Sequence, residues 1–226
     1  MEANLNTQKV SGEKPSLFGM ITSPGVQFER MKTKSPVWGA FVLFILLGTI
    51  MATGAAYLTL INTPEMAKEL NGEAGAMIKG FALGGGALVG VLGTPIGLFI
   101  AAGFYKIIMM FMSNDTPYMK ILSIYLYANL VYYIGGLLNI ALGFVFDGNG
   151  VDVYTSLAPL FEKGTMLHGI ASSIEIFNIW SLILTGLGLH IVAGLSKKQA
   201  TILIVIFFIL TIALGVVRGL VSGFGA

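Results

Sequence analysis

The stretch GLHIVAGLSKKQA, Gly188 to Ala200, lies between two long apolar segments and sets two lysines side by side, Lys197 and Lys198. The chain of 226 residues is 55% hydrophobic and only 11% charged. Soluble domains carry about 25% charged residues. A chain with so few charges cannot cover a surface that faces water, so most of its surface is expected to face lipid. The two lysines therefore predict a tight turn at one face of a membrane.

Outward from this turn, five segments are apolar and long enough to cross a bilayer, which takes about 20 residues each. They cover Val37 to Ile61, Gly80 to Tyr105, Tyr118 to Phe146, Ile170 to Ala193, and Thr201 to Val221. The sequence therefore predicts an all-α integral membrane protein. Residues 37–226 form a bundle of five transmembrane helices, and residues 1–36 form a polar amino-terminal arm with a juxtamembrane element.

The positive charges are distributed unevenly over the two sides of this bundle. Nine of the 13 lysines and arginines fall on the arm, on the second loop with Lys120 beside it, and on the 196–199 turn. The other four fall on the opposite side, at Lys68, Lys79, Lys163 and Arg218. The positive-inside rule therefore predicts a cytoplasmic amino terminus and an external carboxyl terminus.

Two shorter stretches outside the spans carry local signals. In NTPEMAKELNGEAGAM, Thr63-Pro64-Glu65 predicts the start of a brief helix and Asn71-Gly72 its end. DGNGVD, residues 147–152, alternates acids and glycines as calcium loops do. It lacks the twelve-residue ligand pattern and the closing Glu, so an ordinary turn is favoured over a metal site.

The arm contains SPGVQFERMKTKSP, in which Phe28 and Met31 share one helical face among basic residues. This pattern predicts a short interfacial helix with its apolar side in the headgroup layer. The alternative is that the basic residues serve topology alone.

The second span, GFALGGGALVGVLGTPIG, spaces glycines four residues apart, as at Gly86 and Gly90. Small residues let helix backbones approach closely in lipid, which predicts a packing seam within the bundle. A homodimer seam is the alternative. Thr94-Pro95 predicts a kink, because proline removes a backbone hydrogen bond.

Glu175 is the one acid within the fourth span, and Arg218 lies near the end of the fifth. Both are at similar distances from the 196–199 turn, so two antiparallel helices would bring them to one height. We predict a structural ion pair between them, with a proton or substrate site at Glu175 as the alternative.

The motifs of common catalytic sites are absent from the sequence. It has no Cys and only two histidines, His168 and His190, on opposite predicted membrane faces. It contains no HExxH, no GxSxG, no P-loop and no GxGxxG in a βαβ setting. The sequence therefore predicts no enzymatic activity, no cofactor, no metal site and no nucleic-acid partner.

The fourth span resembles the bacterial branch of the Yip family, in which an acid and Phe-x-x-Trp precede a Leu/Gly-rich span that ends in a basic turn and an Ala. The matching positions are Glu175, Phe177, Trp180, Gly188, Leu195, Ser196, Lys197, Lys198 and Ala200. At position 175 this chain has Glu where the family more commonly has Asp. SLFGMITSPGVQFERMKTKSPVWGAF is similar to the family's juxtamembrane element, so the likeness runs from Ser16 to the end.

This resemblance implies a non-enzymatic, multi-pass protein of the bacterial cell membrane. One bacterial member of the family is an accessory protein that works with a MacB-type ABC exporter in defence against a secreted toxic peptide. The resemblance thus implies ABC exporter subunits as partners and toxin resistance as the role. Two alternatives remain: a small-solute or ion carrier that uses the kinked second span and Glu175, and a lipid-organising protein that acts through the basic arm.

Overall fold

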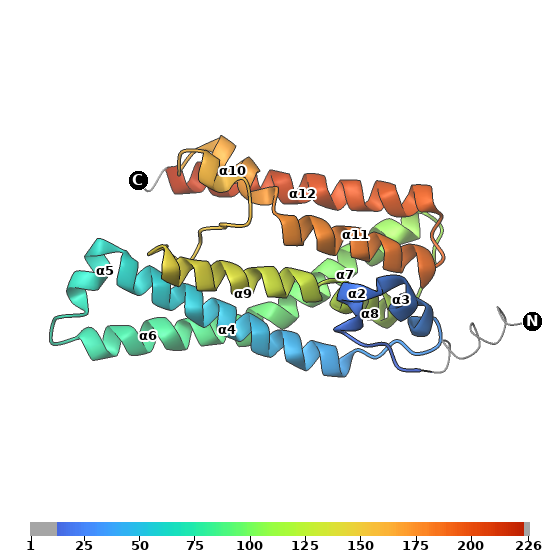
Figure 1. The fold of residues 1–226 in the computed structure, drawn as a ribbon, viewed down its shortest axis with the longest axis horizontal. Helices are drawn as coiled ribbons and strands as arrows, with labels where there is room; N and C mark the ends of the chain where they lie inside the picture. The colour runs from blue at the N-terminus through green and yellow to red at the C-terminus, as the bar shows by residue number, and fades with distance from the viewer. Residues whose placement is uncertain (1–12, 224–226) are drawn as a thin grey trace, which may run out of the picture. The chain divides into compact units, whose positions relative to one another are not determined.

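The computed structural model describes residues 13–223 of the chain, with side chains through residue 221, and this part is all-helical apart from an isolated bridge between Ser156 and Glu175 (Figure 1). Its elements follow in chain order: α2 (Gly19–Thr22), α3 (Pro24–Met31), α4 (Trp38–Asn62), α5 (Pro64–Glu69), α6 (Gly75–Leu88), the π-helical turn η1 (Val89–Gly93), α7 (Thr94–Phe111), α8 (Tyr118–Ala128), α9 (Leu130–Val145), the 3₁₀ turn η2 (Ala158–Leu160), α10 (Met166–Ser173), α11 (Ile176–Ile191) and α12 (Lys197–Gly223).

Three helical stretches are long and apolar enough to cross a membrane. They are Trp38–Asn62, Gly75–Phe111 and Lys197–Val221, of 25, 37 and 25 residues. Helices α8 and α9 form a fourth candidate span when they are taken together. The chain bends by 42° between them, at Asn129. The all-helical membrane class is therefore confirmed with three to four candidate spans.

The predicted fourth span, Ile170 to Ala193, is not one helix. It is divided into α10 and α11 by two non-helical residues, Ile174 and Glu175. With its 16 residues α11 is about 24 Å long, shorter than a hydrocarbon core of about 30 Å. The five-span arrangement therefore stays a prediction.

The local signals beside the second span are reflected in the structure. The brief helix predicted after Asn62 is confirmed as α5, which begins at Pro64 with Glu65 in its first turn. Next to Thr94-Pro95 the helix widens into the π-turn η1. Proline cannot donate to the turn before it, and a π-turn is one way in which a helix accommodates that loss.

The chain divides into two compact units that each gather distant parts of the sequence. Unit 1 comprises residues 1–42, 97–132 and 179–210, and unit 2 comprises residues 43–96, 133–178 and 211–226. Unit 1 thus contains the described part of the arm, the loop after α7 and the 196–199 turn, the regions to which the sequence assigns nine of the 13 lysines and arginines. Unit 2 contains the other four, at the positions that the sequence assigned to the opposite side.

Within unit 2, α4 lies between α9 and α6 (Figure 1). On the α9 side, the ring of Phe44 stacks on that of Tyr133 with 4.6 Å between their centroids. The ring centroids of Tyr57 and Phe144 are 6.1 Å apart. Gly143 of α9 lies against Leu58. Aromatic pairs and small residues therefore set the distance between these two helices.

Unit 1 is built around α8, in which Ile121, Leu122, Ile124 and Leu126 are fully or almost fully buried. A second contact joins α7 to the first half of α12, where the ring of the buried Tyr105 stacks on that of the half-buried Phe207 with centroids 3.7 Å apart. The second half of α8 is therefore buried on nearly all sides and forms the core of this unit.

Candidate functional site

Two buried polar side chains of unit 2, Ser173 and Glu175, lie at the break between α10 and α11. The turn at residues 153–157 runs alongside it: the Leu157 amide donates to the Ile174 carbonyl at 3.3 Å, and the Ile176 amide donates to the Thr155 carbonyl at 3.4 Å. Non-helical backbone at membrane depth is tolerated only where protein or a cavity surrounds it. These hydrogen bonds provide partners for the backbone groups that the break frees.

The Glu175 carboxylate caps α11. Its Oε1 accepts from the Phe177 amide at 3.0 Å, and its Oε2 accepts from the Asn178 amide at 2.6 Å. These are the second and third residues of the helix, whose amides have no partner within it. The side chain is only 6% exposed. A negative charge here is also favoured by the positive end of the helix dipole.

A hydrogen-bond chain ties this cap to α9. The Thr155 hydroxyl donates to Glu175 Oε1 at 2.7 Å and accepts from Asn139 Nδ2 at 2.8 Å. The Asn139 side-chain oxygen in turn accepts from the Thr155 amide at 3.1 Å. Glu175 therefore joins three parts of unit 2: α9, the 153–157 turn and the start of α11.

The predicted ion pair between Glu175 and Arg218 is absent from the structure. Among residues 13–221 the ion pairs are Arg30 with Glu13, Lys32 with Glu29, and Lys163 with Asp152. The Arg218 side chain is exposed on α12. The predicted pair assumed two unbroken helices, whereas the fourth segment breaks at Glu175. The Glu175 carboxylate accepts hydrogen bonds from three nearby donors instead.

The other residues of the family motif have separate places. The Phe177 ring packs against Gly135 of α9, where a Cβ would overlap it. Trp180 is half-buried in the part of α11 that belongs to unit 1. The structure therefore gives Phe177 a packing role and does not combine the candidate residues into one pocket.

The glycine seam of the second span is formed within unit 2. Gly86 and Gly90 are buried against α4. A Cβ at Gly86 would lie 3.0 Å from the Thr53 Cα, and one at Gly90 would overlap the backbone of Thr49. Both glycines therefore permit a backbone-to-backbone approach, as the packing interpretation predicts.

The fifth segment packs in the same way against α10. Cβ atoms at Gly215 and Gly219 would both run into Gly169, and the Ser173 hydroxyl donates to the Thr211 carbonyl at 3.1 Å. The two helices lie side by side in Figure 1. Small residues therefore hold α10 against the second half of α12.

The 196–199 turn is closed by a reciprocal cap. The Gln199 amide donates to Ser196 Oγ at 3.2 Å, and the Ser196 amide donates to Gln199 Oε1 at 3.0 Å. Lys197 and Lys198 are exposed in the first turn of α12, where the helix dipole disfavours positive charge. The lysines therefore do not stabilise this helix, which agrees with a role in topology.

The arm forms the predicted helix, α3, but the prediction for its apolar face is wrong. Phe28 and Met31 are fully buried in unit 1 rather than directed to a headgroup layer. The Phe28 ring and the Ile124 side chain pack so closely against Gly188 that a Cβ at this glycine would overlap both. The Tyr127 hydroxyl also donates to the Pro15 carbonyl at 3.4 Å. The apolar positions thus match a protein core, which helical spacing alone cannot distinguish from a lipid contact.

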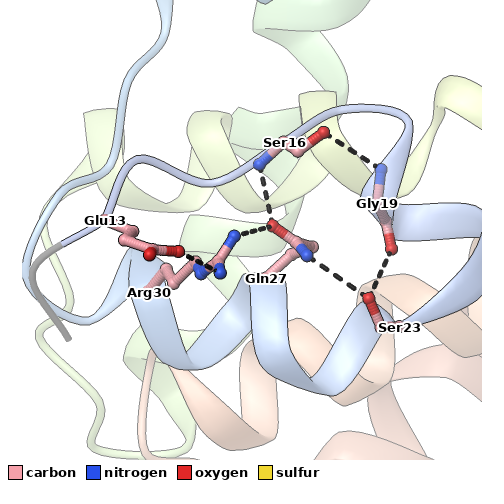
Figure 2. A network of polar contacts seen from close by, with 6 residues as sticks. All are labelled: Glu13, Ser16, Gly19, Ser23, Gln27 and Arg30. Atoms are coloured by element: carbon pink, nitrogen blue, oxygen red, sulfur yellow. Dashed lines mark hydrogen bonds and ion pairs between the residues drawn. The ribbon is translucent and has the colours of Figure 1, made fainter. Parts of the chain in front are cut away.

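A polar network, which sequence reasoning missed, fixes the shape of the arm (Figure 2). Gln27 is buried and accepts from the Ser16 amide at 2.8 Å and from Arg30 Nη1 at 3.3 Å. Arg30 also pairs with Glu13, and Gln27 Nε2 donates to Ser23 at 3.4 Å. The signal available in the sequence was a glutamine on the apolar face of α3, between Pro24 and Phe28.

These features define a class of protein: a polytopic membrane protein. In the part of the chain that the structure describes, its buried polar groups hold helices and helix breaks together. The Yip1 domain matches residues 18–218, so the chain belongs to the Yip1 domain family. The chain is 34% identical over 224 residues to the membrane protein YknW of Bacillus subtilis (strain 168), with 96% of each chain covered. No solved structure matches it.

Proposed function

We propose that this protein assembles or regulates a larger membrane complex without catalysing a reaction, and that its partner is an ABC-type exporter that protects the cell against a secreted toxic peptide. The observation that carries the non-catalytic part is the state of Glu175. Its carboxylate accepts three hydrogen bonds from Thr155, Phe177 and Asn178, and so serves a structural purpose. The exporter as partner rests on the resemblance to the bacterial Yip family.

The proposed topology has five spans, a cytoplasmic amino terminus and an external carboxyl terminus in the bacterial cell membrane. Its support is the division of charge: the arm, the loop after α7 and the 196–199 turn share unit 1 and hold nine of the 13 lysines and arginines. Because α11 is shorter than the hydrocarbon core, this topology requires the non-helical residues before α11 and the turn after it to complete the crossing.

Reporter fusions test this topology. Alkaline phosphatase, which is active only outside the cytoplasm, is expected to be active at Ala226 and inactive in the 196–199 turn. A fluorescent protein that matures only in the cytoplasm should give the reverse pattern. Equal answers at the two sites would contradict a final span between them.

Co-purification tests the proposed partner. The tagged full-length chain, extracted in mild detergent, is expected to retain both subunits of an ABC exporter in stoichiometric amount, identified by mass spectrometry. A tagged membrane protein of another family, expressed at the same level, is the control. Recovery of the chain alone, with exporter subunits no more abundant than in the control, would contradict the proposal.

The same preparation distinguishes the carrier alternative. The small-solute or ion carrier requires Glu175 to change partners, whereas its oxygens are already occupied by two backbone amides and a hydroxyl. We therefore expect no proton, cation or amino-acid flux when the protein alone is placed in liposomes. Flux that is abolished by Glu175→Gln would favour the carrier.

A further inference from the structure

Unit 2 contains a cavity of about 190 Å³ that is lined by the connection between α9 and α10 and by His168 of α10. The residues that give it chemical character are Phe146, Asp147, Asp152, Tyr154, Lys163 and His168. It is smaller than the pockets of about 300–1,000 Å³ that hold drug-sized ligands. Its size suits one small group rather than a whole substrate.

The loop that forms one wall is fixed to α4. The Asn62 side chain donates to the Gly148 carbonyl at 2.8 Å, and the Thr59 hydroxyl donates to the Asn149 carbonyl at 2.6 Å. Gly150 has a φ of +83° and lies so close to Ala55 that a Cβ would overlap the Ala55 backbone. The wall is therefore held in place before any ligand binds.

Asp152 presents one carboxylate oxygen for a cation. Its Oδ2 accepts from the Asn149 amide at 3.3 Å, which orients the group, and its Oδ1 lies 2.8 Å from Lys163 Nζ. The Asp152 side chain is 11% exposed, whereas that of Lys163 is 67% exposed. An ion pair with one long, exposed partner contributes little net stability, so another cation can replace the lysine.

Two aromatic rings, those of Phe146 and Tyr154, line the same cavity as this carboxylate. Phe146 and Tyr154 lie with their centroids 5.5 Å apart, and ring faces attract cations. Burial raises the pKa of the Tyr154 phenol; Asp152 and Asp147 raise it further, and Lys163 lowers it. The phenol thus stays neutral at physiological pH, and Asp152 is paired with one replaceable lysine while Asp147 lines the same cavity.

From this arrangement we infer that the cavity binds an alkylammonium group, with Asp152 as its counter-ion, the Phe146 and Tyr154 rings beside it, and Lys163 Nζ in the ligand's place in the unliganded state. The inference is independent of the exporter partner. An alkylammonium group can come from a lysine side chain or from an ethanolamine headgroup, and both have the same chemistry at Asp152.

Ligand-observed NMR on the full-length protein in phosphatidylcholine nanodiscs tests this inference. The probe is Nα-acetyl-lysine amide, and its uncharged counterpart is Nα,Nε-diacetyl-lysine amide. We expect saturation transfer to the first and none to the second. Added phosphoethanolamine carries the same ammonium group and should compete with the probe: half-displacement below the probe's own Kd indicates an aminolipid headgroup as the preferred source, and half-displacement well above it indicates a lysine side chain.

Two variants should shift the affinity in opposite directions. Asp152→Asn keeps an oxygen for the Asn149 amide but removes the charge, and should weaken probe binding about fivefold or more. Lys163→Gln removes the internal competitor and should tighten binding about threefold. Glu65→Gln, at an exposed acid of α5 outside the cavity, is the matched control and should change nothing.

Opposite shifts cannot result from a general loss of structure, which would weaken binding in both variants. Thermal unfolding in the same nanodiscs checks that the variants remain folded. Equal binding of the two probes, or shifts in the same direction for Asp152→Asn and Lys163→Gln, would overturn the inference.

Discussion

Gly90→Leu should lower the amount of folded protein in the membrane about tenfold, because overpacking costs about 1–3 kcal/mol even where neighbouring side chains can move, and here the neighbour is backbone. A Cβ at Gly90 would already overlap Thr49, so the larger side chain must push α4 away from η1. Fluorescence-detected size-exclusion chromatography of a tagged chain measures the folded fraction.

The second span offers a matched control at Gly97. A Cβ at this position meets nothing within 4 Å, and the residue is exposed. Gly97→Leu should therefore leave the folded amount unchanged, although the substitution is the same and lies two helical turns away. Equal losses in Gly90→Leu and Gly97→Leu would show that glycine matters here for another reason than close packing.

Glu175→Ala is expected to lower the free energy of unfolding by about 2–4 kcal/mol, since it removes a helix cap and leaves two buried amides without an acceptor. Glu175→Gln retains one oxygen acceptor and should cost about half as much. Thermal or denaturant unfolding in detergent, followed by circular dichroism, measures both.

A double-mutant cycle identifies the true partner of Glu175. Thr155→Val removes the hydroxyl that donates to Glu175, so combining it with Glu175→Gln should give a coupling of at least about 0.5 kcal/mol. Arg218→Gln combined with Glu175→Gln should be additive. Coupling to Arg218 and none to Thr155 would restore the ion pair that counting along unbroken helices predicts.

The sequence was sufficient for features that depend on composition and local spacing. Three long apolar helices, the short helix at Pro64 and the seam at Gly86 and Gly90 all follow from hydropathy, capping residues and small-residue spacing. These signals are local, since each element's own residues determine whether it can form or pack closely.

The break at Glu175 could not be predicted in this way, because SSIEIF contains neither proline nor glycine. What stabilises the break is the 153–157 turn, which contains Thr155, about 20 residues earlier in the chain. The one local signal was the motif itself: the family's commoner Asp at 175 is a preferred helix cap, whereas we interpreted the acid as one half of an ion pair. The docking of Phe28 likewise depends on Gly188, far along the sequence.

That docking has a consequence for the order of events during synthesis. The ribosome makes the arm first, but its binding site is completed only when Tyr127 and then Gly188 have followed. At a synthesis rate of about 5–20 residues per second, the ribosome adds Gly188 roughly 8–32 s after Phe28. During that interval the apolar face of α3 is uncovered at the membrane surface. A nascent chain stalled before Gly188 should therefore be cleaved in the arm by a protease that spares the finished protein.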